Sequence, residues 1–149
     1  MHRGTTGVDA FDSRLVLRAN EVRGTDVGVT TGLTSDGTDD VTLNRFSGNG
    51  VGLRLGTFSR TSLQRNRFER NGTGVGTAAS DEEHTLEAVR NTFDRNHDGM
   101  LLDVGTNRLG RNVVRDSTDW GIRAPGAVDL GGNVATGNGH VPQCLGVTC

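Results

Sequence analysis

The stretch that decides the fold is NRFERNGTGV at residues 66–75, because a close copy, NTFDRNHDGM, occurs at residues 91–100. Weaker copies lie on both sides of this pair. In each copy an Asn is followed two residues later by an apolar residue, five later by a small polar residue, and eight later by Gly and an apolar residue. A fixed period of this kind sets the architecture and takes precedence over local signals.

The repeat recurs along most of the chain. Its first residue falls, at steps of 24, 22, 25, 21 and 21 residues, on Asn20, Asn44, Asn66, Asn91, Asn112 and Asn133. Each unit holds three short apolar segments between small polar turns, with period-two alternation and no sustained helical spacing, so it predicts short strands. One unit cannot bury its apolar side chains alone, but it can when stacked on its neighbours at about 4.8 Å.

Stacked units place equivalent residues above one another. We therefore expect an inner apolar column that contains Phe46, Phe68 and Phe93, and a hydrogen-bonded ladder made by the six asparagines. Asn suits such a turn, because it tolerates the left-handed backbone region and its amide both donates and accepts hydrogen bonds.

On these repeats the chain resembles the right-handed parallel β-helix proteins of the pectate-lyase-like superfamily, over roughly residues 7–138. The resemblance implies an all-β, three-sheet solenoid of about six coils. Leucine-rich repeats have a similar period but need a dense Leu pattern that is missing here. We expect one domain, residues 1–149, with coils at 7–138 and a C-terminal cap at 137–149. Residues 7–9 already resemble a strand, so we expect the N-terminal part of the solenoid to be missing.

The family's layout assigns the strand after each Gly to the first sheet. These strands are expected at residues 7–10, 27–30, 51–55, 74–77, 99–103 and 121–124. Alternation then places Val29, Leu53, Val75, Met100 and Ile122 inside. The outward column is expected to contain Asp9, Thr30, Arg54, Gly76, Leu101 and Arg123.

The composition excludes several classes of protein and bears on where the protein is located. The net charge is −2, which argues against a dedicated nucleic-acid binder, and no apolar run is long enough to span a membrane. The first residues lack a signal peptide, so the chain is either cytoplasmic or part of a longer secreted protein. Cys144 and Cys149 suit a terminal disulfide in an oxidising compartment, with two unpaired thiols as the alternative. We expect a secreted bacterial protein that is monomeric.

Enzymes of the resembled superfamily act on polysaccharides along the outer groove of the first sheet and the loops that follow it. The resemblance implies catalytic roles for Arg54 and Arg123, and substrate contacts for Asp9 and Asp103. The acidic loop residues Asp81, Glu82 and Glu83 are expected to hold Ca²⁺, which prefers oxygen ligands. The alternative, that these are solvated loop charges, stays open.

Missing residue types exclude several known chemistries. All 16 basic residues are Arg and the chain has no Tyr, which excludes lyases and epimerases that use a Lys or Tyr base. The pair Asp39 and Asp40 precedes an expected second-sheet strand, so the similarity to polygalacturonase-like hydrolases is weak. Only an Arg-based lyase remains.

Two further sets of polar residues could bind a ligand. Arg65, Arg90 and Arg111 occupy equivalent positions one residue before the ladder Asn, and are either a binding strip for an anionic polymer or solvated side chains, with Glu87 as a candidate partner. The four histidines, at positions 2, 84, 97 and 140, show no metal-ligand spacing.

Two functional hypotheses follow. The first is an extracellular domain that binds or cleaves an acidic polysaccharide. The second is a structural or adhesive solenoid without chemistry, in which the ladders only make the rod rigid.

Overall fold

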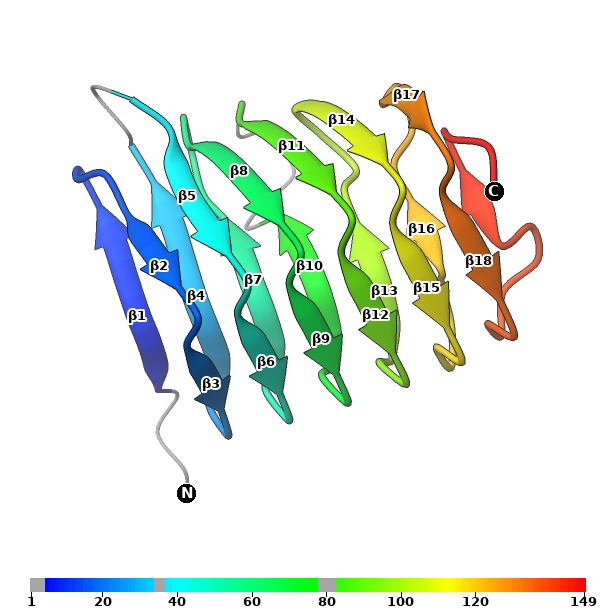
Figure 1. Cartoon of the computed structure of the whole chain (residues 1–149), viewed down its shortest axis with the longest axis horizontal. Coiled ribbons are helices and arrows are strands. Elements are labelled where there is room, and N and C mark those ends of the chain that lie inside the picture. Colours follow the sequence, from blue (N-terminus) through cyan, green and yellow to red (C-terminus); the bar gives the residue numbers. More distant parts are fainter. Residues whose placement is uncertain (1–4, 34–36, 78–82) are drawn as a thin grey trace.

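The protein is a right-handed parallel β-helix of about six coils, seen in a computed structural model that describes residues 5–33, 37–77 and 83–149. Figure 1 shows the coils stacked along the longest axis, with the N- and C-terminal coils at opposite ends. Each coil contributes one strand to each of three parallel sheets. No helix occurs in the described part of the chain, and none there is therefore long and apolar enough to cross a membrane.

The three sheets are named here A, B and C. Sheet A consists of β1 (Thr6–Phe11), β4 (Val27–Gly32), β7 (Val51–Leu55), β10 (Thr73–Thr77), β13 (Asp98–Leu101), β16 (Ile122–Arg123) and β19 (Cys144–Leu145). Sheet B consists of β2 (Val16–Arg18), β5 (Asp39–Thr42), β8 (Arg60–Gln64), β11 (Thr85–Val89), β14 (Thr106–Gly110) and β17 (Val128–Gly131). Sheet C consists of β3 (Glu21–Arg23), β6 (Arg45–Ser47), β9 (Arg67–Glu69), β12 (Thr92–Asp94), β15 (Val113–Arg115) and β18 (Val134–Thr136).

The predicted vertical register is confirmed by the aromatic column. Phe46, Phe68 and Phe93 are fully buried, and their ring centroids lie 4.6 and 4.7 Å apart with planes 5° from parallel. These distances equal the spacing of neighbouring strands, so the rings stack because the strands do. The inner column of sheet A, in which Val29, Leu53, Val75, Met100 and Ile122 are fully buried, is confirmed as well.

Two asparagine ladders run the length of the solenoid. In the first, the backbone N–H of Asn66 donates to Oδ1 of Asn91 at 2.9 Å, and the side-chain amide of Asn66 donates to the Val41 carbonyl at 2.7 Å. The second ladder, at the bend between sheets C and A, joins Asn49, Asn71 and Asn96. It is interrupted at Ser117, whose hydroxyl has no hydrogen-bond partner among the described residues and whose backbone N–H donates to Asn138. The asparagines therefore satisfy the backbone groups that the sharp bends would otherwise leave unpaired.

The predicted reason for the asparagines is wrong in one respect. The left-handed conformation belongs to the residue before each ladder Asn, as at Arg65, Arg90 and Arg111 with φ of 54°, 60° and 55°. None of the six ladder asparagines has a positive φ. Asn is needed here because its amide both donates and accepts, and not because of its backbone tolerance.

The glycine that follows the second ladder allows the coils to approach closely. A Cβ on Gly74 would lie 2.5 Å from the carbonyl oxygen of Gly99 and 2.6 Å from a ring carbon of Phe93. No side chain fits at that distance, so the Gly of the repeat is a packing requirement.

The C-terminal tail joins the solenoid instead of only closing it. β19 pairs with β16, so the tail adds a seventh strand to sheet A. Cys144 and Cys149 form the predicted disulfide, and Oδ2 of Asp129 accepts a hydrogen bond from the backbone N–H of Thr148 at 2.9 Å. The tail is therefore held to the last coil at two points.

Candidate functional site

The outer face of sheet A carries the residues for which a catalytic role was expected. The register places Arg54, Gly76, Leu101 and Arg123 in one outward column, as predicted. Two coils separate Arg54 from Arg123, so their guanidinium groups do not converge on one point of a ligand. Asp9, in β1, lies two strands before Arg54.

Asp103 is the acidic residue that the structure brings into this face. Its Oδ1 lies 2.9 Å from Nε of Arg123. Arg54 and Asp103 line the same open hollow of about 220 Å³, together with Thr73 and Thr77. The face therefore offers cationic, anionic and hydroxyl groups over neighbouring coils.

The expected acidic loop is described only in part. Asp81 and Glu82 lie outside the described residues, and Glu83 borders an open hollow of about 640 Å³ that His84 also lines. His84 is buried, and its Nε2 lies 3.1 Å from Oδ1 of Asn107. The predicted Ca²⁺ site at these three carboxylates stays a prediction.

The three arginines at the bend between sheets B and C lie in consecutive coils, as predicted. The backbone N–H of Arg65 donates to the Val89 carbonyl, and that of Arg90 donates to the Gly110 carbonyl. Glu87, the candidate partner of these arginines, instead has its carboxylate 3.4 Å from Nε of Arg108. That pairing arises because Glu87 and Arg108 point outward side by side from adjacent strands of sheet B.

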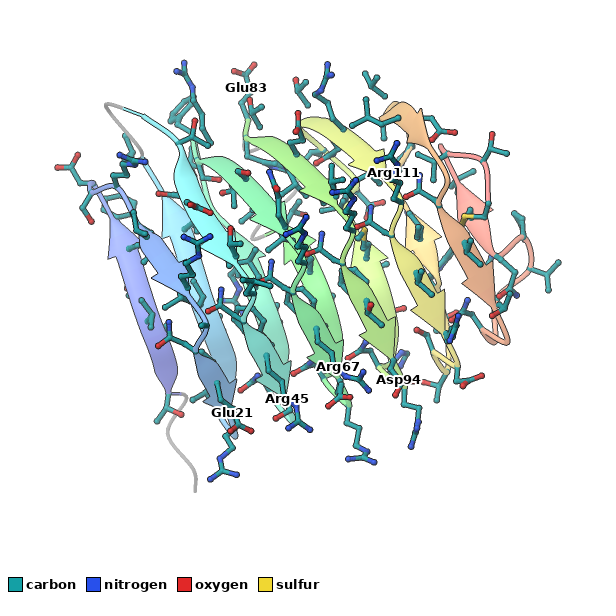
Figure 2. The ribbon with its side chains drawn as sticks, in the orientation of Figure 1. Glu21, Arg45, Arg67, Glu83, Asp94 and Arg111 are labelled. Carbon is teal, nitrogen blue, oxygen red and sulfur yellow. A yellow bond between two sulfur atoms is a disulfide. The ribbon has the colours of Figure 1, made fainter. Side chains whose placement is uncertain are left out.

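The outer face of sheet C carries a row of alternating charges, along which Figure 2 labels Glu21, Arg45, Arg67 and Asp94. Arg45 lies 2.7 Å from Glu69 and 3.8 Å from Glu21, and Arg67 also contacts Glu69. Burial alone would raise the pKa of the Glu69 carboxyl, but hydrogen bonds from the two arginines hold that pKa below its usual value. These ion pairs tie successive coils together and leave no free charge at their centre.

A compact group of metal-ligating side chains lies at the bend that leads from sheet C into sheet A. His97, Asp98 and Asp119 each offer one ligand atom, and these atoms all lie within 4.8 Å of one another. Nδ1 of His97 is 3.4 Å from Oδ2 of Asp98. The backbone N–H of Asp119 donates to the His97 carbonyl at 2.9 Å, so two successive coils build this group, here called the His97 cluster.

Asp98 is the buried member of the His97 cluster. Burial raises the pKa of its carboxyl, and the nearby Asp119 charge adds to this effect. A hydrogen bond from the backbone N–H of Trp120, together with the charges of His97 and Arg123, opposes it only in part. Ionising the buried Asp98 carboxyl therefore still costs free energy. A bound cation would lower that cost, because the described residues place no guanidinium within ion-pair distance of Asp98.

Trp120 and His140 border the His97 cluster. Their ring centroids are 3.5 Å apart, and Nδ1 of His140 lies 3.6 Å from Oδ1 of Asp119. The guanidinium carbon of Arg123 lies 5.7 Å from the Trp120 ring. The single tryptophan of the chain therefore lies directly beside the cluster.

Sequence reasoning missed the His97 cluster, because its members are spread over residues 97–119 in two successive coils and show no short ligand motif. One feature of the repeat could have pointed to the cluster, namely a change in its spacing. From the ladder Asn to the Gly there are eight residues in the copies that begin at Asn66 and Asn91, but nine from Asn112 to Gly121. The extra residue falls in the segment that carries Asp119 and Trp120, and local insertions of this kind often re-aim side chains beside functional sites.

Comparison with known proteins gives one family. No curated protein and no solved structure matches the chain. The model of the NosD family, described as periplasmic copper-binding protein, matches residues 1–89. A periplasmic family agrees with the predicted location outside the cytoplasm and with the disulfide. Because the match covers more than half of the 149 residues, this parallel β-helix chain belongs to the NosD family.

Proposed function

We propose that this protein binds copper(II), and that the His97 cluster holds the ion. The observation that carries the proposal is the convergence of one imidazole and two carboxylates from two successive coils, with ligand atoms within 4.8 Å of one another. The family description, which names copper and not the Ca²⁺ expected from the sequence, supports the choice of metal.

The donor atoms suit the oxidised ion. Imidazole nitrogen and carboxylate oxygen are good ligands for Cu²⁺, which also forms the most stable complexes in the divalent first-row series. Cu⁺ prefers sulfur, but among the described residues Cys144 and Cys149 are joined in a disulfide and Met100 is fully buried. Copper bound here would supply positive charge beside the Asp98 carboxylate and a centre that can change its oxidation state.

The geometry of the His97 cluster, and not the extent of the family match, supports it as the copper site. The match ends at residue 89, before the His97 cluster begins. Within the matched part, the described histidine is His84, and the described residues place no three ligand side chains together there. The cluster is thus the place where the described chain offers copper a set of donors.

The single tryptophan makes the proposal measurable. Cu²⁺ is added to metal-free protein while the fluorescence of Trp120 is recorded, and we expect saturable quenching because the ion binds beside the ring. His97→Ala and Asp98→Asn should each weaken binding at least about tenfold. Asp116→Asn is the matched control, since it removes a nearby exposed carboxylate outside the cluster.

The affinities in these variants decide the proposal. If Cu²⁺ binds the wild-type protein and both cluster variants equally, the ion lies elsewhere. A stronger response to Zn²⁺ than to Cu²⁺ would also contradict the assignment, since these ligands favour Cu²⁺. Electron paramagnetic resonance of the Cu²⁺ complex independently tests whether nitrogen and oxygen atoms ligate the ion.

A second candidate function is the binding of an acidic polysaccharide along the outer face of sheet A. The specific observation is that Arg54 and Asp103 share one hollow while Asp103 pairs with Arg123. The pair supports binding, because it offers a guanidinium and a carboxylate side by side to the carboxylates and hydroxyls of a sugar chain. The resemblance of the repeat to pectate-lyase-like proteins agrees with such a ligand.

This second candidate has its own test. Arg54→Gln should weaken binding of polygalacturonate while leaving Cu²⁺ affinity unchanged. Incubation with polygalacturonate should give no ultraviolet absorbance from unsaturated products if the face only binds. Absorbance that appears in the wild type and disappears in Arg123→Gln would instead establish an Arg-based lyase.

A further inference from the structure

The bend between sheets B and C exposes one residue per coil at an equivalent position. The residues at this position are, in order, Ala19, Leu43, Arg65, Arg90, Arg111 and Gly132. All have positive φ, and each N–H from Ala19 to Arg111 donates to a carbonyl of the next coil. The bend therefore holds three consecutive arginines at one fixed position, here called the arginine strip.

The arginine strip has no acidic partner among residues 5–33, 37–77 and 83–149. Several other guanidiniums of the central coils have acidic partners: Arg45 and Arg67 bind Glu69, Arg108 binds Glu87, and Arg123 binds Asp103. Within the described residues no ion pair involves Arg65, Arg90 or Arg111, and all three are exposed. Their charges are thus available to a ligand from outside.

The arrangement is also unfavourable without a ligand. Arginine is a poor residue for the left-handed region, where the next coil has Gly132. Like charges on neighbouring coils, which are about 4.8 Å apart, repel one another. A linear polyanion would neutralise the three charges and so remove the repulsion. Once one of its anionic groups has bound one arginine, the binding of the next group becomes intramolecular and is favoured by a high effective concentration.

We propose that the arginine strip binds an acidic polysaccharide whose chain runs along the solenoid axis. Each guanidinium pairs with the carboxylate of one sugar unit, since a pyranose ring is about as long as the spacing between coils and guanidinium binds carboxylate with two parallel hydrogen bonds. A nucleic acid fits less well, because the whole chain has a net charge of −2 and would repel a dense polyanion. The inference rests on neither the His97 cluster nor the sheet A face.

The test compares two triple variants with the same loss of charge. Arg65→Gln/Arg90→Gln/Arg111→Gln removes the strip, and Arg70→Gln/Arg95→Gln/Arg115→Gln removes three exposed arginines elsewhere. Arg70 and Arg95 also have positive φ, so the control matches the backbone conformation at two of its positions. Binding of polygalacturonate to both variants and to the wild type is measured in EDTA, which removes copper as a cause.

The expected result is at least a tenfold loss of affinity in the strip variant and less than a twofold loss in the control variant. Binding of the wild type should weaken with added salt, and a trimer of galacturonic acid should bind more tightly than the monomer. Equal losses in both variants, or no binding by the wild type, would overturn the proposal. Equally tight strip-dependent binding of double-stranded DNA would overturn its choice of ligand. Loss of binding in Arg54→Gln alone would assign the polymer to sheet A.

Discussion

The backbone N–H of Trp120 donates a hydrogen bond to Oδ1 of Asp98 at 3.1 Å, across the boundary between two coils. This bond holds a buried carboxylate whose pKa lies above its usual value of 3.8. For a carboxyl with a raised folded pKa, stability is greatest at low pH and falls as the pH rises through the folded pKa. The ionised form at neutral pH is therefore a cost to the folded protein.

Asp98→Asn should stabilise the metal-free protein at pH 7 by about 0.5 kcal/mol. The amide oxygen still accepts the bond from Trp120, while the buried charge is removed. Urea unfolding in EDTA measures the change, and Cu²⁺ should stabilise the wild type more than the variant. Destabilisation by Asp98→Asn would mean that the carboxylate serves the fold and not a metal.

Asn66→Ala should lower the free energy of unfolding by about 3 kcal/mol. The substitution leaves the Val41 carbonyl and the backbone N–H of Asn44 unpaired in a buried bend. Asn20→Ala is the control: Asn20 is exposed, and its side chain donates to the Arg18 carbonyl and to Asn44. Chemical denaturation should show a loss of less than about 1 kcal/mol there. Similar losses at both positions would contradict the role of buried ladder bonds.

Phe68→Ala should lower the free energy of unfolding by about 3–5 kcal/mol, since it opens a cavity between two stacked rings in a fully buried column. Phe11→Ala, at a ring that is 61% exposed, should change stability by less than about 1 kcal/mol. Thermal unfolding followed by circular dichroism distinguishes the two. A small effect of Phe68→Ala would show that the coils close over the gap.

Glu69 should make stability depend on pH in the opposite sense from Asp98. Its folded pKa is lowered from 4.5, so its stabilisation is present above that value and is lost as the pH falls toward the folded pKa. Glu69→Gln should lower the free energy of unfolding by about 2 kcal/mol at pH 7. It should also make the free energy of unfolding fall less steeply as the pH is lowered through the acid range, here called the acid limb. Glu21→Gln, whose carboxylate is half exposed and 3.8 Å from Arg45, serves as the control. An unchanged acid limb in Glu69→Gln would exclude this ion-pair network as its cause.

The repeat predicted the fold in detail because a solenoid turns sequence period into spatial register. Once Phe46, Phe68 and Phe93 are aligned in sequence, the strand spacing alone sets their rings 4.6–4.7 Å apart. The outward column from Asp9 to Arg123 followed from the same alignment. The bend conformation did not follow, because φ at Arg65 depends on how the backbone turns and not on which residues repeat.

The candidate sites also differ in how much of each the sequence could predict. The arginine strip was visible in the sequence, because its members keep one position in the repeat. The sequence did not show that its three arginines have no ion-pair partner in the described part of the chain, since Glu87 pairs with Arg108 through the register of sheet B. The His97 cluster was hidden, because one extra residue shifts Asp119 and Trp120 out of the repeat.

By itself, the sequence determined the stacking of the coils, the buried columns and the asparagine ladder, because identical positions in a periodic chain take identical environments. Only the tertiary structure decided which charged side chains meet. Ion pairs and ligand groups depend on distances of a few ångströms between side chains of different coils, and departures from the period, such as the one before Gly121, change those distances.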